Sequence, residues 1–593
     1  MKRFITSPLL LAFIAGACAV FGFAPFGIFP LPILALALLF WLWSQAQRPA
    51  HAAWIGFAFG MGLFCVGVSW IYVALHEYGY MHPILAAVAT ALFAAVNATL
   101  PALAGYVQAK LRANCSLASN QLLPPSRGGE RSEGAAGMGV DSPGCNTSTP
   151  TLTLPLQGGG DELALDHSGV SAAYGVLLIM PAIWTLAEWI RGFLFTGFPW
   201  LSLGYSQVPN SPLAGYAPVF GVFGVSLMLA LSAGLLVLVV QRTLPSHFKG
   251  ESGLGNKSRK QVRYFPALAL LVIWIVGAAL STVEWTHPQG DPLKVSLLQG
   301  NIAQNEKFAE GSLSGTLETY RRLAQSSDAR LVVLPETALP ILRDNVPQHY
   351  QNILSDHLRK SGGDILIGAF EKDNGNYYNS VYSLGTSESQ HYRKDHLVPF
   401  GEFIPLRGLL GWFINDVLSI PMGDLASGGA TQKPLNVAGQ KVAVDICYED
   451  AFGEEIIRAL PEATLLVNVT NDAWYGDSHA AMQHNQLSQM RALESGRMML
   501  RATNTGVTSV IGTDGRVQAM LPQHQQGVLT TQVQGYSGST PYVRWGNTAM
   551  LVLITLMLVT AWWLQNTPPP TGGGLACPER DEGGRGNSRG KRV

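Results

Sequence analysis

The sequence predicts a two-part protein, with a membrane domain of eight transmembrane helices and an α/β sandwich outside the membrane. The first observation is composition: of 593 residues, 48% are hydrophobic and 13% are charged, against about 25% charged in an ordinary soluble domain. The second is a series of apolar runs long enough to cross a bilayer. The third is a polar block at 285–545, where strand and helix patterns alternate as they do in layered α/β domains.

The apolar runs define the predicted transmembrane helices. The first follows Met1-Lys2-Arg3 and ends near Phe23; because further apolar runs come immediately after it, an uncleaved helix is favoured over a signal peptide. The others lie at 30–45, 54–75, 83–109, 171–191, 212–241, 265–283 and 547–565. We therefore expect a membrane domain of seven helices at 1–284 and an eighth helix at 546–566.

Basic residues in the loops predict the orientation, because Lys and Arg are enriched in cytoplasmic loops. The loop at 242–263 carries six of them, whereas the loops at 24–29 and 76–82 carry none. This asymmetry puts both termini in the cytoplasm. It puts the polar block 285–545 outside, which is the periplasm if the protein lies in the inner membrane of a Gram-negative cell.

Two segments rich in Gly, Pro, Ser and Thr have no hydrophobic period. These are 113–168 and the tail 567–593, and both are predicted to be disordered and cytoplasmic. The sequence suggests no function for either. The formal net charge of zero, from 39 basic and 39 acidic residues, gives no indication of nucleic-acid binding.

The strands of the polar block are predicted at 294–298, 330–334, 365–369, 378–384, 441–446, 464–469 and 507–511. The last is expected to turn at Thr513-Asp514-Gly515 toward another strand at 528–533. Helices are predicted at 313–324, 353–361 and 451–460. Alternation over about 250 residues, the size of one large domain, indicates a single layered α/β sandwich.

One strand ends at Cys447, just before a predicted helix, which would place the thiol at a sharp turn facing a cleft. Most free cysteines are simply small buried hydrophobic residues. Cys447, however, is the only cysteine between residues 285 and 545, so it has no disulfide partner within that block. A reactive thiol is therefore the better interpretation.

Two more polar sites complete a possible catalytic set. Glu336 directly follows an apolar strand, and Lys394 stands eight residues before Glu402 across a Pro/Gly turn. Each of these residues alone would more often be a helix cap or a salt-bridge partner. Together with Cys447 they supply a base, a cation and a thiol. Acyl transfer through cysteine needs these groups to take the proton, stabilise the oxyanion and attack.

The motifs around these residues resemble the Glu-Lys-Cys signature of the nitrilase superfamily. They read Pro335-Glu336-Thr337, Lys394-Asp395-His396-Leu397-Val398-Pro399-Phe400-Gly401-Glu402 and Cys447-Tyr448-Glu449. With seven apolar runs before the block and one after it, the chain resembles the apolipoprotein N-acyltransferase family. Two membrane motifs add to this resemblance, Phe23-Ala24-Pro25-Phe26-Gly27 and Gly197-Phe198-Pro199-Trp200.

The resemblance implies an αββα sandwich and a role for each matching residue. Glu336 would be the general base, Lys394 the oxyanion stabiliser and Cys447 the nucleophile. Glu402 would orient Lys394, while Tyr448 and Glu449 would support the pocket. The substrate-binding residues would be Phe308, which stands where the family often has tryptophan, Trp412, Trp474 and Trp200. No metal and no cofactor are implied.

The family reaction implied by the resemblance is a transfer in two steps. Cys447 would take the sn-1 acyl chain of a phospholipid, typically phosphatidylethanolamine, as a thioester. The α-amine of a diacylglyceryl-modified N-terminal cysteine on an apolipoprotein would then attack it, in the last step of lipoprotein maturation. We expect a monomer, with an apolar lid at 409–414 and 417–421 keeping water from the thioester.

Three alternatives are weighed against this interpretation. A membrane-tethered amidohydrolase of a small amide would need the polar block alone and would make eight transmembrane helices superfluous. A transporter with an extracytoplasmic sensory domain would carry more charged residues inside its helices than Glu188 and a few others. A zinc enzyme is disfavoured because His391/His396 and His479/His484 lack the HExxH spacing and no cysteine pair accompanies them.

Overall fold

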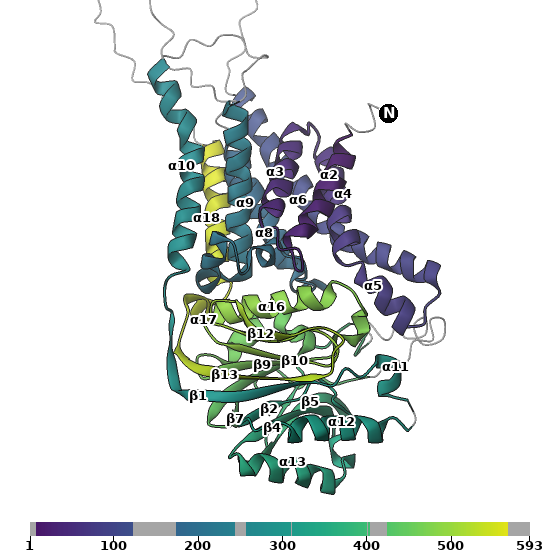
Figure 1. The fold of residues 1–593 in the computed structure, drawn as a ribbon. Coiled ribbons are helices and arrows are strands. Elements are labelled where there is room, and N and C mark those ends of the chain that lie inside the picture. Colours follow the sequence, from purple (N-terminus) through teal and green to yellow (C-terminus); the bar gives the residue numbers. More distant parts are fainter. Residues whose placement is uncertain are drawn as a thin grey trace, which may run out of the picture.

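The computed structural model describes residues 7–121, 173–243, 256–309, 311–399, 401–403 and 424–566. A bundle of apolar helices lies on one side of the molecule and a two-sheet sandwich on the other (Figure 1). The first helix begins, and the last helix ends, at the end of the bundle that points away from the sandwich (Figure 1). The chain therefore enters and leaves the bundle on the same side.

Proline at the first turn marks the start of several bundle helices, where its missing N–H has no intrahelical partner to lose. The helices are α2 (Pro8–Ala19), α3 (Pro30–Gln45), α4 (Pro49–Gly67), α5 (Trp70–Val73), α6 (Pro83–Gln121), α8 (Met180–Arg191), α9 (Ala217–Thr243), α10 (Asn256–Leu280) and α18 (Thr548–Asn566). Each of the eight predicted apolar runs is helical over most of its length. The helix α6 ends inside the insertion predicted at 113–168; the rest of that insertion and the tail 567–593 lie outside the described residues.

Length and composition single out three of the described helices as able to cross a membrane. These candidates span Pro49–Gly67, Pro83–Arg112 and Pro212–Gln241. Shorter apolar helices lie at Pro8–Gly22, Pro30–Gln45, Tyr264–Leu280 and Thr548–Leu564. The crossing of a bilayer by all eight predicted runs stays a prediction.

Two charged side chains buried in the bundle hold a loop at its sandwich end. On α8, Arg191 donates hydrogen bonds to the carbonyl oxygens of Phe198 and Trp200. Glu188, one turn earlier, accepts one from the backbone N–H of Leu203 at 2.9 Å. Charges inside membrane helices often mark a transport pathway. Here both are engaged by backbone groups of the loop, which gives them a structural role.

The sandwich consists of two sheets. The first has the order β13-β1-β2-β4-β5-β6, with β3 paired to β4, and the second has the order β12-β11-β10-β9-β8-β7. The strands of the first are β1 (Thr286–Gln299), β2 (Leu331–Val333), β3 (Leu339–Leu342), β4 (Asp364–Asp373), β5 (Asn376–Gly385), β6 (His391–Arg393) and β13 (Gly527–Gly538). Those of the second are β7 (Leu435–Val437), β8 (Gln440–Ile446), β9 (Leu465–Thr470), β10 (Met499–Thr503), β11 (Thr508–Ile511) and β12 (Val517–Leu521).

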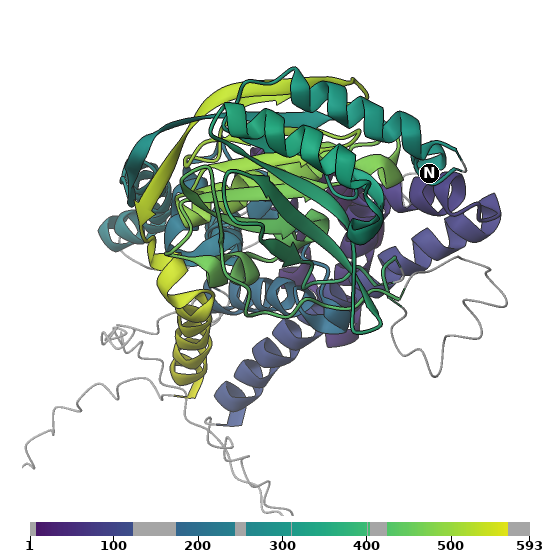
Figure 2. The ribbon, with the colours of Figure 1, turned by 90° about the horizontal axis from the view of Figure 1, so that it is seen from below.

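Helices cover both outer faces of the sandwich. The helices α12 (Leu313–Gln325) and α13 (Gln348–Lys360) lie across the face that points away from the bundle (Figure 2). The helix α16 (Ala480–Ser495) lies between the second sheet and the bundle (Figure 1). Successive side chains of a strand point to opposite faces of its sheet. In β2, Leu331 and Val333 therefore belong to the core between the sheets, and Val332 belongs to the core under α12 and α13. The result is the αββα layering that the resemblance implies.

Parallel pairing brings several strand ends to one edge of the sandwich. The strands β1, β2 and β4 are parallel in the first sheet, and β8, β9 and β10 are parallel in the second. Side chains that follow β2, β8 and β9 therefore lie at the carboxyl edge, where open α/β sheets commonly bind ligands. Cys447 and Asn471 come directly after β8 and β9, and Glu336 comes three residues after the end of β2.

Most predicted strands and helices of the sandwich are confirmed, and two predictions are wrong. The helix expected at 451–460 is broken into short turns, because Phe452 takes a non-helical conformation (φ −110°, ψ 89°), and its ring lies 3.8 Å from that of His396. The strand β11 turns into β12, which the sequence patterns did not predict, while β13 crosses to the first sheet and pairs with β1. The strand at 517–521 was missed because its apolar pattern is short and only half buried.

The helix α16 was missed because its buried residues are largely polar and follow no apolar period. Two of its glutamines contact loops of the bundle. Gln483 accepts a hydrogen bond from Trp200 Nε1 at 2.8 Å, and Gln486 accepts one from the N–H of Ala24 at 3.0 Å. Near the end of the helix, Glu494 accepts one from the N–H of Val222 at 2.6 Å. The polar composition of α16 thus satisfies backbone and side-chain groups at the junction between bundle and sandwich.

Candidate active site

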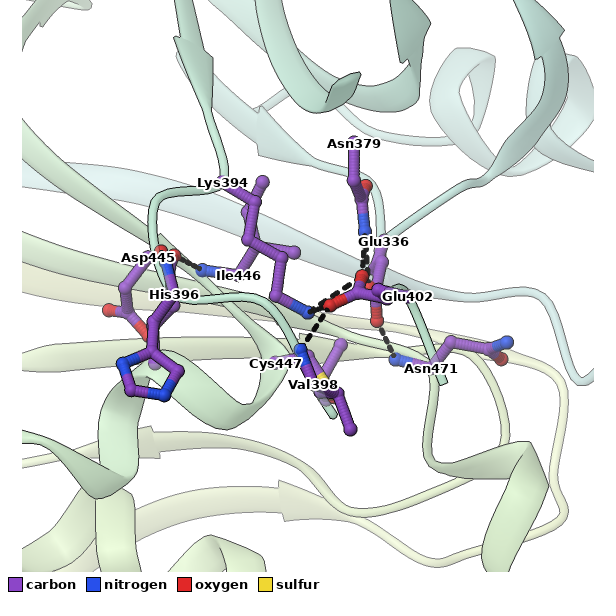
Figure 3. A network of polar contacts seen from close by, with 12 residues as sticks. Glu336, Asn379, Lys394, His396, Val398, Glu402, Asp445, Ile446, Cys447 and Asn471 are labelled. Atoms are coloured by element: carbon purple, nitrogen blue, oxygen red, sulfur yellow. Dashed lines mark hydrogen bonds and ion pairs between the residues drawn. The ribbon is translucent and has the colours of Figure 1, made fainter. Parts of the chain in front are cut away.

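The predicted nucleophile stands at a sharp turn. The strand β8 ends at Ile446, and a 3₁₀ turn over Cys447–Ala451 begins at once. Cys447 has a positive φ of 56°, a conformation that costs non-glycine residues free energy and is concentrated at functional sites. Its side chain is 9% exposed and lies beside the carboxylates and the ammonium group of the site (Figure 3).

The carboxylate of Glu336 is held by two hydrogen bonds. Oε1 accepts from Asn379 Nδ2 at 2.7 Å, and Oε2 accepts from the backbone N–H of Asn471 at 2.8 Å (Figure 3). A glycine behind it permits this position. A Cβ atom at Gly368 would lie 2.3 Å from the carbonyl oxygen of Pro335, so only glycine lets β4 pass this close to the turn that carries Glu336.

Lys394 extends its ammonium group between two carboxylates. Its Nζ lies 2.9 Å from Glu402 Oε2 and 3.7 Å from Glu336 Oε1, and the side chain is 1% exposed (Figure 3). Burial alone would lower the pKa of Lys394, but Glu402 and Glu336 together raise that pKa above its usual value. The amine therefore remains a fixed positive charge in a dry site, as an oxyanion stabiliser has to be.

The thiol of Cys447 is protonated at rest. Burial raises its pKa well above the usual value, and the nearby carboxylate of Glu336 raises the pKa further, against the opposing charge of Lys394. A buried thiol of this kind does not attack without help. It needs a base that removes the proton as the new bond forms, and the Glu336 carboxylate is the acceptor in its neighbourhood.

Glu449 ties the lysine segment to the cysteine segment. Its Oε1 accepts hydrogen bonds from the N–H groups of Asp395 at 2.7 Å and His396 at 3.0 Å. Its Oε2 accepts from the N–H of Ile446 at 2.6 Å. The carboxylate thus fixes the backbone just after Lys394 relative to the backbone just before Cys447.

Tyr448 connects the cysteine turn to the bundle. Its hydroxyl donates to the carbonyl oxygen of Gly197 at 3.2 Å, and its ring lies 6.3 Å from that of Trp200. Three residues later, the carbonyl oxygen of Ala451 accepts a hydrogen bond from Tyr205 OH at 3.0 Å. The turn that carries the thiol therefore rests on the loop at the sandwich end of the bundle.

The four aromatic residues predicted to bind substrate have different surroundings. Phe308 is 56% exposed and Trp474 is 45% exposed. Both stand next to segments that contact Glu336, because Lys307 precedes Phe308 and Asn471 lies three residues before Trp474. Trp200 is 1% exposed and lies within the junction between bundle and sandwich. Trp412 and the whole predicted lid, 409–414 and 417–421, lie outside the described residues.

Lys307 is a site residue that sequence reasoning missed. It ends α11 (Gln304–Lys307), is 2% exposed, and donates from Nζ to the carbonyl oxygen of Glu336 at 3.2 Å. Burial lowers the pKa of Lys307 to about 8, against the opposing effects of Glu336 and Cys447. A lysine in a short polar segment usually faces solvent. Only the fold reveals that this one points inward.

Comparison with known proteins gives matches over both parts of the chain. The profile of the carbon–nitrogen hydrolase family matches residues 294–542. That of the apolipoprotein N-acyltransferase N-terminal domain matches 15–125 and 163–235. Two curated proteins named apolipoprotein N-acyltransferase are similar over nearly their whole length. The one from Nitrosomonas europaea is 45% identical over 93% of this chain and 96% of its own. The one from Methylococcus capsulatus is 40% identical over 91% and 92%.

Among solved structures, a carbon–nitrogen hydrolase superfamily protein from Xanthomonas campestris is 18% identical. It covers 45% of this chain and 97% of its own, with a TM-score of 0.31, a likeness too slight to support an argument.

Proposed function

The chain belongs to the apolipoprotein N-acyltransferase family, and we propose that it acylates lipoproteins through a thioester on Cys447. It is thus an N-acyltransferase whose acceptor is a lipoprotein and whose acyl donor is a phospholipid. The observation that carries the residue-level proposal is the convergence of three groups at one edge of the sandwich. Glu336 and Lys394 follow strands of the first sheet, and Cys447 follows a strand of the second.

In the first half-reaction, Glu336 removes the proton from Cys447 as the sulfur attacks the carbonyl carbon of the sn-1 ester. The negative charge that develops on the carbonyl oxygen is stabilised by the ammonium of Lys394. When the tetrahedral intermediate collapses, the carbon–oxygen bond to glycerol breaks and the leaving oxygen takes the proton from Glu336. The products are a lysophospholipid and an acyl thioester on Cys447.

In the second half-reaction, the α-amine of the lipoprotein's N-terminal diacylglyceryl-cysteine attacks the thioester carbonyl. Glu336 takes a proton from the attacking nitrogen, and Lys394 again faces the developing oxyanion. The carbon–sulfur bond breaks to give the amide, and the Cys447 thiolate regains a proton from Glu336. Each step uses groups whose positions within the fold are fixed by Asn379, Asn471 and Glu402.

We place the reaction at the periplasmic face of the inner membrane. Residues 1–284 and 546–566 would form the eight transmembrane helices, and residues 285–545 the periplasmic catalytic domain. Supporting this, the first helix starts and the last helix ends on the side of the bundle away from the sandwich (Figure 1). Protease added to spheroplasts should then cut within 285–545 and spare the N-terminus. Cleavage of the N-terminus instead would show that the protein has the opposite orientation in the membrane.

The acyl donor is proposed to be phosphatidylethanolamine, and the enzyme a monomer. The exposed rings of Phe308 and Trp474, beside the segments that hold Glu336, suit contact with acyl chains. Trp200 would contribute indirectly, through its contacts with Tyr448 and Gln483. Trp412 remains a proposed lid residue.

The experiment that tests the proposal is intact-protein mass spectrometry. The protein is incubated with a phospholipid that carries different sn-1 and sn-2 chains, and no acceptor is added. We expect a mass increase of one sn-1 acyl group on Cys447, which disappears when a diacylated lipopeptide is supplied and reappears on that peptide. Hydrolysis of a small amide without any acyl adduct would instead favour a membrane-tethered amidohydrolase.

Replacing Lys307 by methionine should slow adduct formation about tenfold below pH 8, equivalent to about 1.4 kcal/mol. The positive charge of Lys307 favours the ionised form of Glu336 before the attack and the thiolate of Cys447 that develops in the transition state. Because the pKa of Lys307 is about 8, the native side chain carries this charge below pH 8 and loses it above. The two rates should therefore converge as pH rises through 8 to 9, when adduct formation is measured at each pH.

A matched control is Lys294→Met, which removes a partly exposed lysine of β1 that pairs with Asp328. This variant should follow the native pH profile. If Lys307→Met is slowed equally at every pH, its effect is structural and the electrostatic explanation is wrong.

A further inference from the structure

The backbone of Cys447 needs support from its surroundings. With φ at +56°, it occupies a left-handed conformation that L-residues avoid unless neighbouring contacts hold them in it. This conformation decides the direction of both the carbonyl group and the side chain. A contact that fixes the carbonyl oxygen of Cys447 therefore also aims its sulfur.

Two buried side chains supply that contact. Asn468, on β9, donates from Nδ2 to the carbonyl oxygen of Cys447 at 3.1 Å. His484, on α16, approaches the same oxygen with Nε2 at 3.2 Å. Both side chains are fully buried. They come from two different layers of the fold, the second sheet and the helix α16.

An ion cluster in turn holds these two donors. Arg501 donates to Asn468 Oδ1 at 2.7 Å and pairs with Asp450 and Asp472, each at 3.0 Å. His484 lies between the same two carboxylates, with Nδ1 at 2.8 Å from Asp472 and Nε2 at 3.0 Å from Asp450. The guanidinium and the imidazolium balance the two carboxylates. With the cluster fully buried, this arrangement gives it no net charge.

The protonation of His484 suits its role as a donor on both ring nitrogens. Burial and the charge of Arg501 would lower the pKa of His484, but Asp450 and Asp472 raise it to about 9. The ring is therefore an imidazolium at neutral pH. Both N–H groups remain available, one for Asp472 and the other for the Cys447 carbonyl oxygen and Asp450.

We propose that Asn468 and His484 are positioning residues that keep the Cys447 turn in its left-handed conformation and aim the sulfur at Glu336. The Arg501 cluster acts through them and touches no reacting atom. The inference rests on the proposed role of Cys447 as the nucleophile. It goes further by assigning a function to buried residues of β9, α16 and β10 that otherwise look like ordinary core.

The test compares variants that keep or remove each donor. Asn468→Asp preserves shape but replaces the amide donor by an acceptor, and His484→Leu removes both ring donors. We expect each to slow acyl-adduct formation at least tenfold at saturating phospholipid, without changing the phospholipid concentration that gives half the maximal rate. His484→Gln, whose amide can still donate to the carbonyl oxygen, should recover most of the rate.

A second readout does not depend on lipid chemistry. Alkylation of Cys447 by iodoacetamide, followed by peptide mapping, should slow in parallel with adduct formation, because a misaimed thiol loses its base. This readout still tests the positioning role of Asn468 and His484 if the native protein forms no acyl adduct from phospholipid. That outcome would contradict the proposed function alone.

The matched control is Asn485→Ala, the next residue on α16, which is equally buried and hydrogen-bonded only to Ser509 Oγ at 2.6 Å in the described structure. It removes a buried polar side chain from the same helix and should keep the native rates. Three outcomes would overturn the inference: native alkylation rates in Asn468→Asp and His484→Leu, no recovery in His484→Gln, or an equal loss of rate in Asn485→Ala.

Discussion

Replacing Cys447 by serine should abolish the acyl adduct and the transfer to lipopeptide, with a loss of at least about 10³-fold. The thiol at this position already has a raised pKa, and a hydroxyl in the same buried site would be far harder to ionise. The amine also displaces a thiolate much more readily than an alkoxide, so the second half-reaction would suffer as well. Intact-protein mass spectrometry with phospholipid alone, then with lipopeptide, measures both losses.

The control is Cys18→Ser, which changes an exposed cysteine of the bundle helix α2. It should leave the adduct and the transfer unchanged. An acyl adduct that forms at the native rate in Cys447→Ser and is lost in Cys18→Ser would move the nucleophile away from the carboxyl edge and rule out the proposed mechanism.

Replacing Glu336 by glutamine should slow adduct formation about 10²- to 10⁴-fold, the range typical for loss of a general base. Glutamine cannot take the thiol proton. It also has one acceptor where glutamate uses two, since Asn379 Nδ2 and the Asn471 N–H both donate to this carboxylate. Single-turnover adduct formation over a range of phospholipid concentrations should show a reduced maximal rate with half-saturation little changed.

A matched control is Glu388→Gln, which makes the same chemical change at an exposed position of the sandwich. Native behaviour is expected there. If Glu336→Gln forms the adduct within about threefold of the native rate, too little for the loss of a base, then the proton of Cys447 goes to another group and the role of Glu336 is wrong.

The residues of the site could be located from the sequence because they stand at strand ends. A run of β-branched residues stops just before Cys447, and another apolar strand stops just before Glu336. Strand ends are visible in local patterns, and parallel strands bring their ends to one edge. The sequence grouped Glu336, Lys394 and Cys447 by their chemistry and by the resemblance, and the parallel pairing seen in the structure brings the strand ends to one edge.

The same reasoning could not find residues whose importance comes from distant contacts. Lys307 looks like a surface lysine in the sequence, yet its amine lies against the carbonyl oxygen of Glu336. His484 was considered only as a poor zinc ligand, and the helix that carries it has no apolar stripe. Asn468 lies within β9, whose other residues already fit the pattern of an ordinary buried strand. No local period distinguishes such positions from ordinary ones.

Composition and periodicity were enough to determine which segments form apolar helices, which form several strands of the sandwich, and which side chains stand at the ends of those strands. These features depend on periods of two and 3.6 residues, which are local properties of the chain. Three-dimensional packing was needed to learn how the cysteine turn is braced, how α16 joins the sandwich to the bundle, and that a second amine lies beside the base. Those features are contacts between residues that are usually far apart in sequence, and folding alone brings such residues together.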